Sequence, residues 1–161
     1  MANPLYDRLF GCHAGRAATF LHLPDGGRMS FDAFLRLAAR SAHALRTAGL
    51  SPGDRLALQV EKSAEALAIY AACVQAGVIL LPLNTGYTID EVEYFVGDSG
   101  ASLLLCDPGQ EPALRPVAGR AGAELMTLGA AGTGTFPEAA AEQPEPRCSI
   151  PPAPPGAPRG R

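Results

Sequence analysis

The stretch Ala76-Gly77-Val78-Ile79-Leu80-Leu81-Pro82-Leu83-Asn84-Thr85-Gly86-Tyr87 decides the fold of this 161-residue chain. Gly77 fits the C-cap of a preceding helix, and the apolar run that follows is long enough for a strand buried on both faces. The polar turn after Leu83 leads to Thr88, which fits the N-cap of another helix. This order is the exit of a βαβ unit, and α/β proteins bind ligands at such strand ends.

Helix and strand signals alternate along the rest of the chain. Helices are predicted over residues 3–10, 31–48, 63–75, 88–96 and 111–120. Strands are predicted over residues 17–23, 28–29, 55–60, 78–83, 102–106 and 123–128. Pro112 and Pro116 weaken and break the last helix. The β-α-β-α-β order from residue 55 onward predicts an α/β fold with a parallel sheet and right-handed crossovers.

Two of these helices carry an apolar stripe that predicts their buried face. In the helix over 31–48 the stripe is Phe31, Phe34, Leu35, Ala38, Ala42 and Leu45. In the helix over 63–75 it is Ala66, Leu67, Tyr70, Cys73 and Val74.

The overall composition is typical of a globular chain. Its net charge of −3 gives no electrostatic argument for binding nucleic acid or an anionic membrane. No apolar run approaches the ~20 residues of a membrane span, and the N-terminus lacks the pattern of a signal peptide. The four cysteines, Cys12, Cys73, Cys106 and Cys148, form no C-x-x-C pair, so we expect reduced thiols in a cytoplasmic protein.

Five segments resemble a known family in their order and spacing. They are MSFDAF (29–34), GLSPGDR (49–55), QVEKSAEAL (59–67), LPLNTGYT (81–88) and EVEYFVGD (91–98). These segments are similar to the AMP-forming acyl-CoA synthetases of the adenylate-forming superfamily. The sequences VEKS (60–63) and PLNTGYT (82–88) resemble the malonyl-CoA synthetase branch in particular.

The resemblance implies a fold and a reaction. Residues 1–128 would form the first parallel-sheet part of the large N-terminal domain, which is incomplete here. The intact enzyme would convert malonate, ATP and CoA into malonyl-CoA, AMP and pyrophosphate, with Mg²⁺ screening the phosphates. In the family, the phosphate loop, the acidic ribose ligand and the lysine of the mobile C-terminal domain lie beyond the matching region. No catalytic, cofactor-binding or metal-binding residue is therefore assigned in this chain, and we expect it to bind no cofactor and to be inactive alone.

The composition changes after Gly129. Eight of the fifteen prolines lie from Pro137 onward, and residues 129–161 are predicted to be a Gly/Pro-rich linker and a disordered tail. The resemblance fades near Gln143. A proline- and arginine-rich ending is typical of GC-rich DNA read in another frame, so we expect a truncated or frame-shifted gene.

Several polar groups have both a functional and a structural interpretation. Glu61-Lys62-Ser63 follows one strand end and Asn84, Thr85 and Tyr87 follow another, where ligands bind, but a helix N-cap and a turn explain them as well. Gly129–Thr135 lacks the lysine of a phosphate loop and is followed by Pro137, which interrupts any immediate helix and favours a flexible linker.

The remaining charged and imidazole groups favour structural roles. His13, His22 and His43 share no metal-ligand spacing. Asp90, Glu91 and Glu93 fit a capping box and the dipole of a helix start. Arg36, Arg40 and Arg46 fit the solvated face of a helix.

Three alternatives to an inactive N-terminal part of a malonyl-CoA synthetase stay open at this point. The chain could be a stand-alone α/β module that binds a nucleotide or an acyl-CoA. It could belong to another acyl-CoA ligase branch. It could also pair with a separately encoded remainder of the enzyme; no nucleic-acid or membrane partner is expected.

Overall fold

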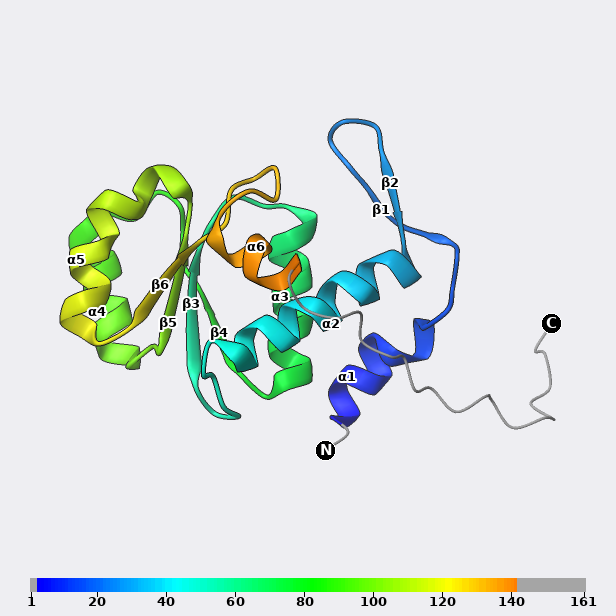
Figure 1. The fold of residues 1–161 in the computed structure, drawn as a ribbon, viewed down its shortest axis with the longest axis horizontal. Helices are drawn as coiled ribbons and strands as arrows, with labels where there is room; N and C mark the ends of the chain where they lie inside the picture. Colours follow the sequence, from blue (N-terminus) through cyan, green and yellow to red (C-terminus); the bar gives the residue numbers. More distant parts are fainter. Residues whose placement is uncertain (1–2, 142–161) are drawn as a thin grey trace.

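A computed structural model of the chain describes residues 3–141. Four parallel strands form the central sheet in the order β4-β3-β5-β6. Their bounds are Arg55–Gln59 for β3, Ile79–Pro82 for β4, Leu103–Cys106 for β5 and Glu124–Thr127 for β6. Helices cover both faces of this sheet, and Figure 1 shows the resulting three layers nearly edge-on. The predicted α/β fold with a parallel sheet is confirmed.

The helices of one layer are α2 (Phe31–Thr47), α3 (Ala64–Ala76) and α6 (Thr135–Ala141). Serine N-caps begin the first two: the Ser30 hydroxyl accepts from the Ala33 amide, and the Ser63 hydroxyl accepts from the Ala66 amide, both at 3.1 Å. Gly77 ends α3 with a φ of 75°, a left-handed conformation that glycine adopts without strain. The layer packs on the sheet face that contains Leu56, Leu58, Leu103 and Leu105.

The helices of the other layer are α4 (Ile89–Ser99) and α5 (Glu111–Ala121), preceded by a short 3₁₀ turn, η2 (Pro108–Gln110). The Thr88-Glu91 capping box begins α4 as the sequence predicts. At the other end of α4, Arg55 donates to the carbonyl oxygens of Ser99 at 2.7 Å and Gly100 at 2.6 Å. This layer packs on the face that contains Ala57, Leu81, Leu104 and Cys106.

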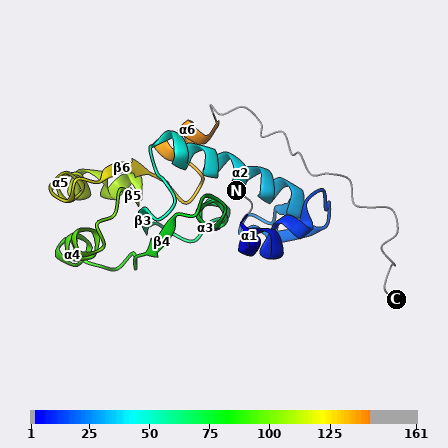
Figure 2. The same ribbon diagram turned by 90° about the horizontal axis from the view of Figure 1, so that it is seen from below.

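The N-terminal elements lie beyond α2 and α3. Helix α1 (Pro4–Leu9) is capped by Asn3, which also donates to the Val74 carbonyl of α3, and η1 (Gly11–His13) follows. Strands β1 (Thr19–His22) and β2 (Arg28–Ser30) form a separate antiparallel hairpin. Figures 1 and 2 show this hairpin at the far end of α2 from the central sheet.

The prediction that residues 78–83 form a strand buried on both faces holds only in part: Leu80 and Leu81 pack on opposite helix layers, but β4 itself is incompletely buried. Strand β4 is an edge strand, and the Ile79 side chain is 55% exposed. The strands with helices on both faces and neighbours on both sides are β3 and β5, and all four residues of β5 are buried. An apolar run indicates a strand in an α/β sheet, but it carries no information on whether that strand has one neighbour or two.

The predicted buried face of α3 is correct for Cys73, which is 1% exposed, and wrong for Leu67 and Tyr70. Leu67 and Tyr70 are 37% and 41% exposed. The residues that α3 buries are Ala68, Ile69, Ala71, Ala72 and Cys73. Helix α3 is apolar on almost every side, and Glu65 and Gln75 are its charged and amide residues. Its sequence therefore has no polar face opposite an apolar one, which is the pattern that indicates the buried side of a helix. Its alanines allow the close approach of α2, which is its main helical neighbour.

Two further predictions near prolines need correction. Helix α5 is continuous: Pro112 lies in its first turn, where an amide has no helical partner to lose, and the burial of Leu114 and Val117 holds the helix together across Pro116. Residues 135–141 form α6, not a linker, because Pro137 also falls in a first turn. The predicted disordered tail lies outside the described residues from 142 onward.

Candidate functional site

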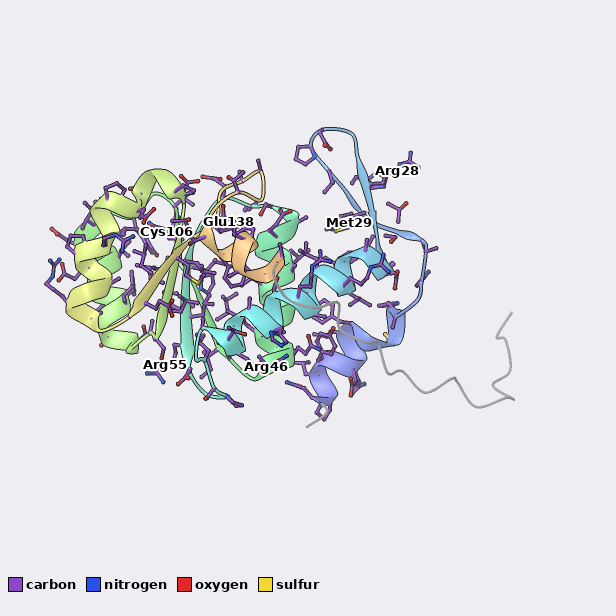
Figure 3. All side chains as sticks on the ribbon, in the orientation of Figure 1. Arg28, Met29, Arg46, Arg55, Cys106 and Glu138 are labelled. Carbon is purple, nitrogen blue, oxygen red and sulfur yellow. The ribbon has the colours of Figure 1, made fainter. Side chains whose placement is uncertain are left out.

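The strands are parallel, so the carboxyl ends of β3, β4 and β5 lie at the same end of the sheet. This end is where α/β proteins place ligands. Figure 3 shows Cys106, the last residue of β5, toward this end and Arg55, the first residue of β3, at the opposite end. A shallow cavity of about 250 Å³ opens between these strand ends. The residues that line it are Gln59, Glu61, Thr85, Asp107, Gly109 and Gln110.

Gln59 is the buried polar residue of this cavity. It ends β3, is 5% exposed and lies beside Cys106 in the register of β3 and β5. Its Nε2 donates to the Asn84 carbonyl at 3.0 Å and to the Tyr87 carbonyl at 3.5 Å. Gln59 therefore holds the 84–87 loop against the end of β3.

The 84–87 loop also stabilises itself. The Asn84 Oδ1 accepts from the Gly86 amide at 2.8 Å, and the Tyr87 amide donates to the Asn84 carbonyl at 3.1 Å. The Tyr87 ring stacks on Phe95 of α4, with 5.3 Å between the ring centroids. The loop is thus fixed at three points, and it presents Thr85 to the cavity.

Asp107 supplies the opposite wall. It follows β5 directly, and its Oδ1 accepts from the Gly109 amide at 2.8 Å, which begins η2. The cavity thus combines two carboxylates, two amides and a hydroxyl, groups that accept hydrogen bonds from a donor-rich ligand. Among the described residues that line it, none carries an imidazole, a thiol or an amine.

Only some of the strand-end residues identified from the sequence lie together around this cavity. Thr85 and Glu61 line the cavity, whereas Lys62 is exposed and is absent from its lining. Ser63 is the N-cap of α3, as its structural interpretation predicts. Sequence reasoning missed Gln59, Asp107 and Gln110, although Asp107 follows a predicted strand directly and the same strand-end rule could have found it.

The histidines and cysteines have structural surroundings. His13 packs against the Phe31 ring at 4.5 Å, and His43 lies 3.3 Å from the Thr47 hydroxyl. Within residues 3–141 no three His, Cys, Asp or Glu side chains gather as a metal site would require. Burial raises the pKa of Cys73 to about 12. Burial, aided by the carboxylates of Glu111 and Asp107, raises the pKa of Cys106 to about 11.

The carboxylates at the start of α4 behave as predicted, with one addition. The Glu91 Oε2 accepts from the Thr88 amide at 2.8 Å, and this bond lowers the pKa of Glu91. Glu93 pairs with Arg120 of α5 through two bonds of 2.6 and 2.7 Å, which lower the pKa of Glu93. No local sequence pattern indicates this link between α4 and α5, because Glu93 and Arg120 lie 27 residues apart.

The arginines of α2 do not share one solvated face. Arg36 is exposed and pairs with Asp32, and Arg46 is exposed. Arg40 is half-buried and lines a second cavity beneath α6. The prediction is wrong for Arg40 because α6, which covers it, was not expected.

Residues 129–134 form an ordered turn, not a flexible linker. The Gly129 amide donates to the Thr133 carbonyl at 2.7 Å, and Gly132 and Gly134 adopt positive φ values. The turn contains no lysine, so it does not provide the cation of a phosphate loop. None of the helices within residues 3–141 is both long and apolar enough to span a bilayer.

Comparison with known proteins gives consistent matches along nearly the whole chain. The pattern of the AMP-binding enzyme family matches residues 11–158. The benzoate–CoA ligase of Thauera aromatica is 30% identical over 149 residues, which are 84% of this chain and 28% of that protein. The fatty acid–[acyl-carrier-protein] ligase ScoC of Streptomyces coeruleorubidus is 32% identical over 107 residues, which are 66% of this chain and 21% of that protein.

Among solved structures, apo MatB from Rhodopseudomonas palustris superposes with a TM-score of 0.86 and 37% identity. The superposition covers 93% of this chain and 30% of the MatB chain. The chain thus spans about a fifth to a third of the length of these relatives. The family pattern covers most of the chain, and the parallel sheet superposes on that of MatB: this chain belongs to the AMP-binding enzyme family.

Proposed function

We propose that this chain forms the first α/β part of an AMP-forming ligase that joins an acid to a thiol. The observation that carries the proposal is the family match over residues 11–158. In such an enzyme ATP adenylates a carboxylate and releases pyrophosphate, and the thiol of CoA then displaces AMP to give the thioester. The free energy of ATP cleavage thereby drives thioester formation.

We further propose malonate as the acid and the cytoplasm as the compartment. The wording of residues 60–63 and 82–88 resembles malonyl-CoA synthetases, and the 37% identity with MatB extends over 93% of this chain. The predicted compartment rests on the cysteines: Cys73 and Cys106 are buried and unpaired, a usage that fits a reducing environment.

The described residues do not fit a complete ATP site. A triphosphate with Mg²⁺ needs a cation-bearing loop, and the 129–134 turn has none, while Lys62, the sole lysine of the chain, is absent from the lining of the strand-end cavity. We therefore propose that the 161-residue chain does not form malonyl-CoA by itself. ATP, Mg²⁺ and CoA would bind the intact ligase, which carries groups beyond the region described here.

A two-part assay tests this proposal. The purified chain is incubated with malonate, ATP, Mg²⁺ and CoA, and malonyl-CoA is measured by chromatography; we expect none. The chain is then combined with a separately produced polypeptide that comprises the remaining two thirds of MatB, and we expect malonyl-CoA to form. Thioester formation by the chain alone would disprove its proposed inactivity, and no activity after combination would count against its role as a ligase part.

A second candidate function rests on the strand-end cavity. In this candidate function the chain binds a nucleotide or an acyl-CoA without turnover, and the acceptor groups around Gln59 would receive hydrogen bonds from the base amine or the ribose hydroxyls. The phosphates would have to lie outside the cavity, because the Glu61 and Asp107 carboxylates repel them. Calorimetric titration with ATP, AMP and malonyl-CoA tests this function. Saturable heat that Gln59→Leu abolishes would support it, and no heat with any of the three would exclude it.

A further inference from the structure

A second cavity lies on the other side of the sheet from α4 and α5. It has a volume of about 450 Å³ and opens between α2, α3 and α6, within the size range of small-molecule sites. Figures 1 and 2 show α6 lying beside α2. Its apolar walls are Leu37, Ile69, Leu128, Phe136 and Ala140.

Ser41 places a hydroxyl in the lining of the cavity. The residue is 3% exposed, and it lines the cavity together with Arg40 and the apolar wall. A serine hydroxyl both donates and accepts, so it can donate to a ligand carboxylate in the cavity.

Two opposite charges face the same space without pairing. Arg40 of α2 and Glu65 of α3 are half-buried and line the cavity. In the described part of the chain neither has an ion pair or a side-chain hydrogen bond, with each other or with any other residue. The Glu65 carboxylate lies at the Gly132 end, since its Oε1 would be 3.0 Å from a Cβ placed on Gly132.

We propose that this cavity binds a small zwitterion with an apolar body, of the chemical class of an α-amino acid with an aliphatic side chain. Its carboxylate pairs with Arg40, its ammonium pairs with Glu65, and the Ser41 hydroxyl donates to the carboxylate. The aliphatic part packs on Ile69 and Phe136. The site differs in place from the strand-end cavity at Gln59, and the proposal does not rest on the ligase function.

The two charges define the ligand because a singly charged one satisfies only half of the site. A carboxylate without an ammonium leaves Glu65 partly desolvated and unpaired. An amine without a carboxylate leaves Arg40 in the same state. A zwitterion supplies a partner for each of the two charges.

The experiment is calorimetric titration of the full 161-residue chain with three matched probes at equal concentration. They are L-leucine, 4-methylpentanoate, which lacks the ammonium, and 3-methylbutylamine, which lacks the carboxylate. We expect saturable binding of L-leucine and at least tenfold weaker binding of the other two. No binding of L-leucine at millimolar concentration, or equal binding of either analogue, would overturn the proposal; neither result depends on any variant folding.

Variants then locate the site. Arg40→Gln and Glu65→Gln should each weaken L-leucine binding at least tenfold while the melting temperature changes little. Arg36→Gln is the matched control, since Arg36 lies one turn earlier on α2, is exposed and pairs with Asp32. Equal weakening by Arg36→Gln, or unchanged binding in both cavity variants, would show that L-leucine binds elsewhere and would disprove the site.

Discussion

Thr127 and Thr135 lock the end of β6 to the start of α6 through two reciprocal hydrogen bonds. The Thr127 amide donates to the Thr135 hydroxyl at 2.9 Å, and the Thr135 amide donates to the Thr127 hydroxyl at 3.0 Å. The pair closes the 129–134 turn and places Phe136 in the core on the α2 and α3 side of the sheet.

Removing the Thr127 hydroxyl should loosen this lock. Thr127→Val keeps the side-chain shape but leaves the Thr135 amide without its acceptor, so we expect a loss of ~1–2 kcal/mol in the free energy of unfolding. Urea denaturation measures it. Thr47→Val, at an exposed position near the end of α2, is the control and should change stability by less than ~0.5 kcal/mol. An equal effect of both variants would show that the reciprocal bonds contribute nothing specific.

Gly134 should not tolerate a side chain. Its φ is 120°, and a Cβ there would lie 2.5 Å from the Thr127 carbonyl oxygen. Gly134→Ala should therefore lower stability by more than ~2 kcal/mol. Gly97→Ala is the matched opposite case, because a Cβ at this position in α4 meets nothing within 4 Å; it should raise stability by ~0.5–1 kcal/mol. Thermal unfolding measures both: the melting temperature of Gly134→Ala should lie below that of the unchanged protein, and that of Gly97→Ala should lie above it. A Gly134→Ala variant that melts at or above the unchanged protein would contradict the prediction.

The α4 capping box should make stability depend on pH. The Thr88 backbone bond lowers the pKa of Glu91 below its ordinary value of 4.5. The stabilisation is therefore complete at pH values above 4.5 and is lost as the pH falls through the lowered pKa of the folded state. Glu91→Gln should cost stability at pH 7 and much less at pH 3, as urea denaturation at both pH values would show. Glu124→Gln, whose side chain makes no hydrogen bond within residues 3–141, serves as control. A constant cost of Glu91→Gln across this range would refute the assignment.

The buried thiols should be unreactive in the folded chain. Because the pKa values of Cys73 and Cys106 are raised to about 12 and about 11, their thiolate fractions at pH 8 are very small, and burial blocks access. Iodoacetamide at pH 8 should label the exposed Cys12 first and should label Cys73 and Cys106 only after urea is added. Peptide mass spectrometry measures the order. Rapid labelling of Cys73 without denaturant would indicate that α3 does not pack as described.

Gln59 should hold the 84–87 loop in place. Gln59→Leu removes the donor to the carbonyls of Asn84 and Tyr87, so amide hydrogen exchange should accelerate in that loop. Gln110→Leu is a useful control, since Gln110 lines the same cavity without bonding to the loop. Unchanged exchange in Gln59→Leu would show that the Asn84 turn and the Tyr87–Phe95 stack hold the loop alone.

The sequence predicted much of the fold and little of the strand-end cavity. Ser30, Ser63 and Thr88 are caps in the structure because a cap depends on residues within one turn of the helix. Thr85 could be placed at a strand end because it lies just after the apolar run of residues 78–83 in the chain. Gln59 and Asp107 could not be brought together in advance, because β3 and β5 are neighbours only through a pairing that skips β4 along the chain.

By itself the sequence determined the kinds and order of the elements as far as β6, and the α/β class, since caps, glycine C-caps and apolar periodicity act over a few residues; it did not indicate α6. The tertiary structure alone decided that β4 lies at an edge, that α3 exposes Tyr70, and that Arg40 lies under α6. Each of these depends on contacts between segments far apart in the chain. Whether a residue is buried depends on which segments pack around it, and the local sequence does not specify those segments.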